Sequence, residues 1–472
     1  MSRRFAIRQG SKVRMIDDFS ISGINETCIT HCKVDLHMID TFCAVLKRYF
    51  DVLGGGGGSC ELVGKTYDLK SAYRQVPIKE SHLKYAFFSV YNHELGEPQV
   101  YQLLTLPFGA THSVYSFLRL SRMLYSVATR CLFLLTTNFY DDYILASRPA
   151  LAESSSSSME LVFMLTGWQF AREGKKSTAF SRTCKALGVE FDFHRSEARL
   201  ASVCNTTARV EELLGLIDAA LTSKALTRQE SLVLRGKLGF ADSYLHGRLG
   251  SYVLKLLVEH AYAPGVQLGA QLGMALQFMS RRLRENAPLI VSAGHAANWY
   301  LYTDASYEPD TKSGGLGAVL VDNDGKVAKW FGVVLPRDVC LKLRAAYKDT
   351  IIYELELAAA VLSFHVWASD IESGMQVWFG DNDAVRHALI RGAGAGGVAD
   401  VFIQSYLEVE ASKNLTTWFA RVPTEANISD WPSRNESHPL LLERHNCRDD
   451  AVAKWQVLLQ LVESKRDGLL GR

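Results

Sequence analysis

The pattern of apolar and polar positions predicts strands in the first part of the chain and helices in its middle. The segment NFYDDYIL predicts a β-hairpin in which strand residues run through Tyr140, Asp141 and Asp142 form the turn, and YILAS returns. The segment KTYDLKSAYRQVPI predicts a strand that presents Asp68 at its end, followed by a short helical stretch. Apolar spacings of three and four predict helices between residues 205 and 262.

The last third of the chain repeats this arrangement of strands that lead into acids. Asp304 ends the strand-like run in NWYLYTDASYE, and Asp381 ends another in MQVWFGDNDAVRHAL. Between them, GGLGAVLVDNDGKVAKWFGVVL predicts two hairpin-linked strands, and IIYELELAAAVLSFHVW predicts a helix with Glu354 and Glu356 near its start. Asp430 then opens a predicted helix in NISDWPSR.

Acidic residues next to buried strands need a physical reason, because an unpaired carboxylate is costly to remove from water. Taken singly, Asp68 is explained as a helix N-cap, Asp381 as a turn residue, and Asp430 as an acid favoured by a helix dipole. If the hairpin lies beside the strand of Asp68, however, Asp141 and Asp142 join it at one edge of a sheet. Carboxylates at such short distances repel one another unless divalent cations lie between them. The pattern therefore predicts two magnesium ions and an in-line phosphoryl displacement.

Two homopolymer tracts interrupt the chain, at Gly54 to Gly58 and Ser154 to Ser158. Neither composition can bury apolar area to offset its ordering entropy, so both predict flexible surface connections.

Composition narrows the class of protein. With 472 residues and 48% hydrophobic content, the chain can form several globular domains, and 52 Lys plus Arg against 50 Asp plus Glu neither require nor exclude a polyanion partner. The nine cysteines include no Cys-x-x-Cys, and the first residues lack the apolar core of a secretory signal. No apolar run approaches the roughly 18 residues of a membrane span. We expect an intracellular protein, cytoplasmic or nuclear, that is not secreted and has no membrane partner.

The motifs YDLKSAYRQVPI, LPFGATHSVYSF and FYDDYIL come in the order and approximate spacing of polymerase motifs A, B and C. In this respect the chain resembles reverse transcriptases, most closely those of retrotransposons. KVRMIDDFSISGIN is similar to the fingers motif of that family, GWQFAREGKKS and CKALGVEFD to motifs D and E, and the helical region after them to the thumb and connection. Only about sixty residues precede motif A, so the fingers are shorter than in most relatives.

The resemblance implies that Asp68 and Asp141 hold a catalytic magnesium pair, with Asp142 as a supporting carboxylate. From the residues alone, Tyr73 also fits a half-buried helix aromatic, and Lys176 an exposed lysine. The implied nucleotide contacts are Arg14 on the incoming triphosphate, Tyr73 as a gate against a ribose 2′-hydroxyl, Phe108 and Gly109 against the nascent base pair, and Lys176 near the leaving phosphate.

The second set of acids lies in the order strand, helix, strand, helix, which resembles the ribonuclease H fold and its four-carboxylate, two-metal site. The segment ELAAA favours Glu356 over Glu354 as the helix ligand. RVPTEANISD lacks the histidine that many cellular ribonucleases H carry there, so slower or differently tuned activity is implied. The ligands implied by the match are Asp304, Glu356, Asp381 and Asp430.

Together these resemblances predict an α+β and α/β multidomain chain, a right-hand polymerase followed by a ribonuclease H-like domain. The expected parts are fingers and palm at 1–204, helical thumb and connection at 205–296, a ribonuclease H-like domain at 297–436, and a helical tail at 437–472.

The predicted function is that of a retroelement RNA-directed DNA polymerase with ribonuclease H activity. It implies two Mg²⁺ ions at each site, or Mn²⁺, and as partners an RNA template, a DNA or RNA primer, deoxynucleoside triphosphates and an RNA–DNA hybrid. Two alternatives stay open: a catalytically weak or domesticated nucleic-acid scaffold, and a chain in which only the nuclease works. The sequence leaves the oligomeric state undetermined.

Overall fold

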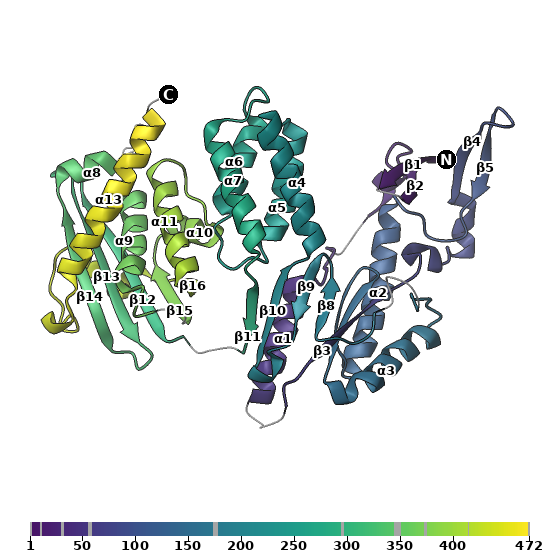
Figure 1. The fold of residues 1–472 in the computed structure, drawn as a ribbon, viewed down its shortest axis with the longest axis horizontal. Helices are drawn as coiled ribbons and strands as arrows, with labels where there is room; N and C mark the ends of the chain where they lie inside the picture. The colour runs from purple at the N-terminus through teal and green to yellow at the C-terminus, as the bar shows by residue number, and fades with distance from the viewer. Residues whose placement is uncertain are drawn as a thin grey trace. The chain divides into compact units, whose positions relative to one another are not determined.

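The computed structural model divides the chain into two compact units of mixed α/β structure (Figure 1). Unit 1 comprises Met1–Thr206 with Ile290–Gly294, and unit 2 comprises Thr207–Leu289 with His295–Arg472. The finer division into four parts stays a prediction. The structure describes residues 2–9, 12–29, 33–54, 59–172, 178–293, 297–343, 351–371, 375–413 and 415–470.

The described residues of unit 1 form three sheets, with strand orders β2–β1–β4–β5, β3–β7–β6 and β11–β10–β9–β8. The hairpin predicted around the two aspartates is present as β6 and β7, and β7 pairs antiparallel with β3. The strands are β1 (Ser2–Gln9), β2 (Lys12–Asp18), β3 (Val63–Asp68), β4 (Phe87–Asn92), β5 (Glu97–Gln102), β6 (Leu135–Phe139), β7 (Asp142–Ser147), β8 (Thr183–Ala186), β9 (Val189–Asp192), β10 (Leu200–Asn205) and β11 (Leu289–Ser292).

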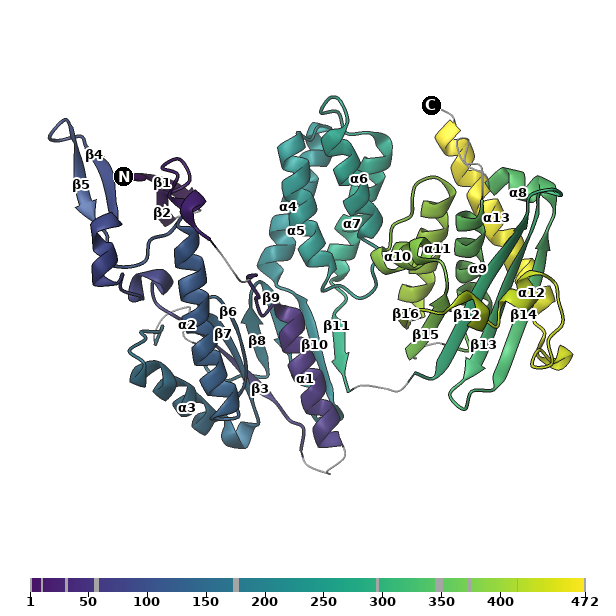
Figure 2. The ribbon, with the colours of Figure 1, turned by 180° about the vertical axis from the view of Figure 1, so that it is seen from behind.

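Helix α2 packs beside β6 and against α3 (Figure 2). It buries one apolar face, where Phe117 and Leu124 meet Tyr143 of β7 and Phe163 of α3 in a common core. This packing holds the β6–β7 hairpin in place next to its two aspartates. The helices of unit 1 are α1 (Ile39–Gly54), α2 (Thr111–Arg130) and α3 (Ala152–Leu165), with short 3-10 helices η1 (Ile24–Thr27), η2 (Ala72–Gln75), η3 (Glu80–Tyr85), η4 (Pro149–Leu151) and η6 (Ser196–Ala198).

The expectation of a flexible serine tract is wrong. Ser154 to Ser158 lie inside α3, and Ser156 Oγ bonds Tyr67 OH at 2.8 Å and accepts from Lys65 Nζ at 2.8 Å. Tertiary hydrogen bonds to β3 stabilise the helix in place of the apolar burial that serines cannot provide. A hydroxyl that faces a neighbouring strand has hydrogen-bond partners that it would lack in a linker. Of the glycine tract, residues 55–58 lie outside the described residues, and Gly54 ends α1.

Unit 2 begins with the predicted helices, four of which pack around a common apolar core that includes Leu213, Ile217, Leu238 and Leu257. Thr227 forms a capping box at the start of α5. The helices are α4 (Thr207–Ser223), α5 (Arg228–Asp242), α6 (Ser251–Tyr262) and α7 (Ala270–Glu285).

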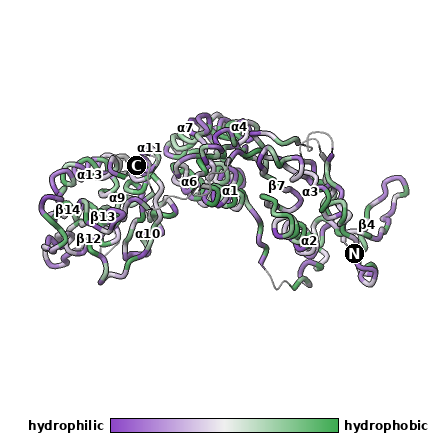
Figure 3. Tube along the Cα trace, turned by 90° about the horizontal axis from the view of Figure 1, so that it is seen from below, coloured by the Kyte–Doolittle hydropathy of each residue, from purple (hydrophilic) through white to green (hydrophobic). Residues whose placement is uncertain are grey.

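The rest of unit 2 is a five-stranded sheet of order β14–β13–β12–β15–β16, in which β15 runs parallel to both neighbours. Figure 3 shows α9, α11 and α13 on one side of strands β12 to β14. The strands are β12 (Trp299–Glu308), β13 (Ser313–Asp322), β14 (Val327–Leu335), β15 (Met375–Gly380) and β16 (Thr416–Arg421). The helices are α8 (Arg337–Leu343), α9 (Ile352–Trp367), α10 (Asp383–Arg391), α11 (Val398–Ser412), α12 (Asp430–Ser433) and α13 (Arg448–Leu470), with η7 (Thr424–Ala426) and η8 (Glu443–His445).

Two predicted element ends need correction. Strand β6 ends at Phe139, so that the hairpin turn is Tyr140 and Asp141, while Asp142 begins β7. Asp304 does not end its strand, because β12 continues to Glu308 while pairing with β13 along its whole length. Among the described residues, no helix is long and apolar enough to cross a membrane.

Two candidate carboxylate sites

Three aspartates meet at one end of the β3–β7–β6 sheet, and we call them the N-terminal acid cluster. Asp68, the last residue of β3, lies opposite Asp142, the first residue of β7. Asp141 occupies the turn just before, where its carbonyl accepts a hydrogen bond from Leu69 N at 3.0 Å. Directly paired residues in an antiparallel ladder have Cα atoms about 4.5–5.5 Å apart, so the ladder holds these carboxylates close together.

The turn that presents Asp141 depends on its neighbour. Tyr140 has φ 51°, in the left-handed region that two-residue hairpin turns use. Its carbonyl accepts from Ser121 Oγ at 2.5 Å, and Ser121 also bonds Tyr143 OH at 2.8 Å. Helix α2 therefore holds the unusual turn conformation through one buried serine.

Tyr73 lies on η2 with its ring packed among aromatic neighbours. Its ring centroid is 5.0 Å from that of Phe108 and 4.9 Å from that of Phe117. Burial, with smaller contributions from Tyr140 and Asp141, raises the pKa of Tyr73 to about 12. Tyr73 is thus a neutral, positioned aromatic beside the N-terminal acid cluster.

Gly109 has a backbone that only glycine fits. Its φ is +100°, and a Cβ built there would lie 2.1 Å from Asp17 O. Asn25 fixes the same loop from the side, because its Nδ2 donates to Gly109 O at 3.0 Å and its Oδ1 accepts from Thr111 N at 2.9 Å. Sequence reasoning singled out Gly109 and Phe108 but missed Asn25.

Two predicted nucleotide contacts have no described side chain. Arg14 lies on β2 with its backbone paired to Ile7, and its side chain lies outside the described part of the structure. Lys176 falls in residues 173–177, which are outside the described residues altogether. Both roles stay predictions.

A second group of acids, which we call the C-terminal acid cluster, comes together in unit 2 from four separate elements. Asp304 lies on β12, Glu356 on α9, Asp381 directly after β15, and Asp430 at the start of α12. Asp304 is buried, with 7% of its surface exposed. The structure thus brings together residues that are up to 126 positions apart (430 minus 304).

The charges of the C-terminal acid cluster act on one another. Burial, and then the nearby Asp430 and Asp381, raise the pKa of Asp304 to about 6. Burial, together with Asp381 and Asp304, raises the pKa of Glu356 to about 8. Both shifts have the sign expected of desolvated carboxylates that repel each other.

Each member of the C-terminal acid cluster also accepts a hydrogen bond that sequence reasoning did not predict. These bonds orient all four carboxylates. Only one donor is a cation, so the charge of the other three carboxylates is not neutralised by its donor. The donors are Ser433 Oγ to Asp304 Oδ2 at 2.6 Å, Asn382 Nδ2 to Glu356 Oε1 at 3.2 Å, Thr424 Oγ1 to Asp381 Oδ2 at 2.7 Å, and Arg434 Nε to Asp430 Oδ1 at 2.8 Å.

Helix α12 reaches Asp304 because glycines on the sheet leave room for its backbone. A Cβ at Gly315 would lie 1.8 Å from Ser433 O, one at Gly317 would lie 2.4 Å from Ser433 N, and one at Gly332 would lie 2.5 Å from Pro432 O. Each contact is to a backbone atom, which cannot move away by a change of rotamer as a side-chain atom can. The glycines therefore seat Asp430 over the face of β12 that carries Asp304.

The acids fit divalent cations by chemistry. Within the part of the chain that the structure describes, no group of three or more His, Cys, Asp or Glu side chains is placed so that it could hold a metal ion as it stands. The donor set of each cluster is nevertheless all carboxylate oxygen, which suits Mg²⁺ and Mn²⁺. At the C-terminal acid cluster, a bound cation would also relieve the repulsion that raises the pKa of Asp304 and Glu356.

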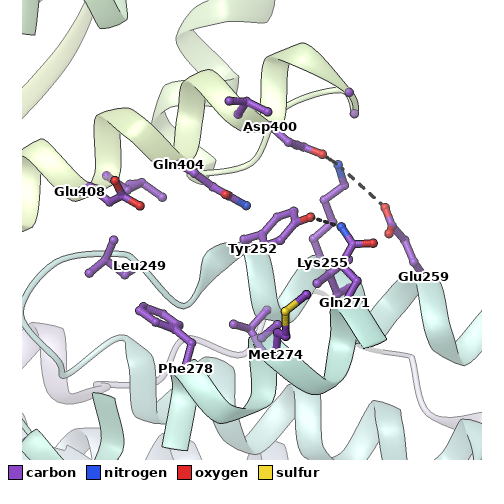
Figure 4. Close-up of a pocket in the computed structure, with 17 residues that line it drawn as sticks. Leu249, Tyr252, Lys255, Glu259, Gln271, Met274, Phe278, Asp400, Gln404 and Glu408 are labelled. Carbon is purple, nitrogen blue, oxygen red and sulfur yellow. Dashed lines mark hydrogen bonds and ion pairs between the residues drawn. The ribbon is translucent and has the colours of Figure 1, made fainter. Parts of the chain in front are cut away.

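Among the hollows in the described part of unit 2, two flank the helices and lie outside the predicted sites. One, of about 560 Å³, is lined by Tyr353 of α9 and by His387 and Arg391 of α10, the helix that follows Asp381. The other, of about 730 Å³, lies between α6, α7 and α11, and none of its lining residues belongs to the C-terminal acid cluster (Figure 4). At its edge Lys255 Nζ pairs with an oxygen of Asp400 at 2.5 Å. Sequence reasoning predicted neither hollow.

Comparison with known proteins finds a structural likeness without a sequence match. No family model matches the chain, and no curated protein matches it. Three similar solved structures are of a foamy viral protease-reverse transcriptase: a dRH form with double-stranded DNA, the enzyme with double-stranded DNA, and the enzyme with an RNA/DNA hybrid. Their TM-scores are 0.48, 0.48 and 0.49, and their identities are 14%, 15% and 14%.

These similarities extend over nearly all of this chain but over only part of each foamy viral chain. The matches cover 89%, 89% and 90% of this chain, and 65%, 78% and 51% of the foamy viral chains in the same order. At this level of identity no residue role transfers from one protein to the other.

Proposed function

We propose that this chain is a retroelement RNA-directed DNA polymerase that also cleaves the RNA strand of RNA–DNA hybrids. The observation that carries the proposal is the pairing of Asp68 with Asp142 beside Asp141, because roughly seventy residues separate Asp68 from the other two in the sequence. The C-terminal acid cluster supports the second activity independently, since its four carboxylates come from a strand, a helix, the residue after a second strand, and a second helix.

In the proposed polymerase site, Asp68 and Asp141 hold two ions and Asp142 supports them. Magnesium or manganese would supply positive charge for the attacking primer hydroxyl and the departing pyrophosphate. Tyr73, whose ring packs against Phe108, is the proposed gate against a ribose 2′-hydroxyl. Gly109 is the proposed backbone contact of the nascent base pair, and Arg14 and Lys176 are the proposed contacts of the triphosphate.

In the proposed nuclease site, Asp304, Glu356, Asp381 and Asp430 are the cation ligands. Burial raises the pKa of Glu356 to about 8, which favours its protonated form at neutral pH, and a bound cation would favour the carboxylate instead. Arg391 in the neighbouring hollow offers a cation for the phosphate backbone of a hybrid.

The proposed partners follow from these two sites: an RNA template, a DNA or RNA primer, deoxynucleoside triphosphates, and the RNA–DNA hybrid that extension produces. Such contacts are mainly to phosphates, so binding weakens as salt rises. An intracellular location, cytoplasmic or nuclear, belongs to the same proposal.

Primer extension on an RNA template with magnesium tests the polymerase. We expect extension by the unmutated chain and a loss of about 100-fold or more in Asp141→Asn, which removes a charge that the metal pair needs. Asp142→Asn should lose less, since its carboxylate only supports the pair. Absence of extension by the unmutated, folded chain would reject the polymerase and leave the nuclease-only alternative.

Cleavage of a labelled RNA–DNA hybrid tests the nuclease separately. Asp381→Asn should abolish cleavage while primer extension continues, because the two acid clusters lie in different units. If the unmutated chain binds a hybrid but neither extends nor cleaves, the non-catalytic scaffold is the correct interpretation.

A further inference from the structure

The sheet of unit 2 carries a row of aromatic rings on the face opposite helix α9. Tyr302 of β12 pairs with Phe379 of β15, and their rings stack with centroids 4.8 Å apart and planes 13° apart. Tyr300 stacks on the same Phe379 at 6.5 Å and 27°. One strand further, Trp418 of β16 is 65% exposed. We call Tyr300, Tyr302 and Phe379 the aromatic platform.

Strand alternation assigns the aromatic platform to this face. Leu301 and Trp378 are buried in the core that contains α9, so their neighbours along each strand point the other way. Two residues beyond Tyr302 and Phe379, on the same face, come Asp304 and Asp381. Because a strand rises about 3.3 Å per residue, the platform begins roughly 7 Å from the C-terminal acid cluster.

A hollow of about 780 Å³ lies over the aromatic platform. Its lining also includes the apolar Ile428 and Leu440 and the exposed cations Lys326 and Arg444. Its described lining residues include no carboxylate. Stacked rings and exposed cations in one lining match the two parts of a nucleotide, a base with a π face and an anionic phosphate.

We propose that this hollow binds single-stranded nucleic acid, with bases stacked on the aromatic platform and phosphates near Lys326 and Arg444. The proposal goes beyond the two activities, because it needs neither acid cluster to be catalytic. Stacking accepts any base, so the surface should bind RNA and DNA strands with little sequence preference. A strand held there would run along β12 and β15 toward Asp304 and Asp381.

The first test measures binding of fluorescein-labelled oligo(U) and oligo(dT) of about eight nucleotides, within the ~4–16 range typical of such surfaces. The buffer contains EDTA, so cleavage plays no part. The double variant Tyr302→Leu with Phe379→Leu keeps apolar bulk but removes stacking, and we expect binding weaker by about fivefold or more. Tyr262→Leu, which alters an exposed aromatic of α6, is the matched control and should bind as the unmutated chain does.

A charge variant covers the case in which the double variant fails to fold. Arg444→Glu changes an exposed side chain, and it should weaken binding and reduce its salt dependence. Lys454→Glu, an equal charge change on an exposed position of α13, should do neither.

A position-specific readout separates the hollow from nucleic acid bound by unit 1. Oligonucleotides with 4-thiouridine or 4-thiothymidine should crosslink to peptides that contain the aromatic platform. Crosslinks confined to residues 1–206, with unchanged affinity in all platform variants, would overturn the proposal. So would a platform variant that changes only the sedimentation coefficient, since the face would then join two copies of the chain. Binding without hybrid cleavage would reject the nuclease and leave this proposal standing.

Discussion

Gly317 shows how one absent side chain sets the geometry of the C-terminal acid cluster. A Cβ there would lie 2.4 Å from Ser433 N and 2.5 Å from Ser429 O, both backbone atoms at α12. Gly317→Ala must therefore displace α12 and move Asp430. We expect a loss of about 1–3 kcal/mol in the free energy of unfolding, as for other overpacked sites, together with slower hybrid cleavage. Urea unfolding and a cleavage assay measure the two effects.

Gly236 provides the matched control for this substitution. It lies in α5, and no atom lies within 4 Å of the position that a Cβ would take there. Gly236→Ala should therefore stabilise the chain by about 0.5–1 kcal/mol and leave cleavage unchanged. Equal behaviour of the two variants would refute the crowding argument at Gly317.

His365 of α9 makes the free energy of unfolding of unit 2 depend on pH in a defined direction. Its Nε2 lies 2.8 Å from Ser405 Oγ, and burial, with a smaller effect of Lys454, lowers its pKa to about 4. The unfolded chain takes up this proton near pH 6.5 and the folded chain only near pH 4, so stability falls as pH drops between these values. The slope from this group is at most about 1.4 kcal/mol per pH unit.

Comparison with His365→Gln isolates that contribution. Asp304 and Glu356, whose raised pKa values act with the opposite sign, are present in both proteins and cancel in the difference. In urea titrations from about pH 4 to 7 with EDTA, the variant should lose less stability on acidification than the unmutated chain. Parallel curves for the two proteins would contradict the lowered pKa.

At the scale of single residues, the sequence predicts the acids of the two clusters better than it predicts their hydrogen-bond donors. Acid types at strand ends and helix starts have a local signature, whereas Ser433 and Thr424 reach their carboxylates across 129 and 43 residues, with no periodic pattern to mark them. Asn25 is hidden for the same reason, since it holds a loop 84 residues away. Hydroxyl and amide donors at long range become visible only when the fold is known.

At the scale of elements, Ser156 explains why a serine tract is helical. Its hydroxyl bonds Tyr67 and Lys65 of β3. Ser156→Ala should therefore lower the free energy of unfolding by about 1 kcal/mol for each lost bond, offset by about 0.5 kcal/mol from the higher helix propensity of alanine. Ser154 is exposed in the same helix, and Ser154→Ala should be neutral or slightly stabilising. Urea unfolding of both variants decides the point, and equal values would show that β3 does not support α3.

Element types follow from the sequence where periodicity is strong and fail where composition is taken alone. The β6–β7 hairpin and the helices after residue 205 are confirmed, because burial of one face imposes its period on the sequence. The prediction that β12 ends at Asp304 is wrong, because a charged residue alone does not end a strand. Pairing with β13 along its whole length keeps β12 extended through the acid.

At the scale of the whole chain, charged contacts join the four-helix part of unit 2 to helices α10 and α11 of the part that contains its five-stranded sheet. Arg248 donates through Nε and Nη2 to both oxygens of Glu410, at 3.0 and 2.8 Å, and through Nη1 to Leu389 O at 2.9 Å. Tyr406 OH donates to the same Glu410 at 2.7 Å. The Glu410 side chain is only 9% exposed, so this joint is largely shielded from water.

Glu410→Ala removes the carboxylate and leaves Arg248 half-buried without its counter-charge. Breaking a buried pair costs about 3–5 kcal/mol, and partial exposure of Arg248 favours the lower end. We expect calorimetry to show unit 2 unfolding in two steps, because the four-helix part loses its ion pair with α11 before either part unfolds. Glu463→Ala breaks the exposed pair with Lys342 and should cost about 1 kcal/mol or less with no new step. A single, unshifted transition for Glu410→Ala would mean that apolar contacts alone join the two parts.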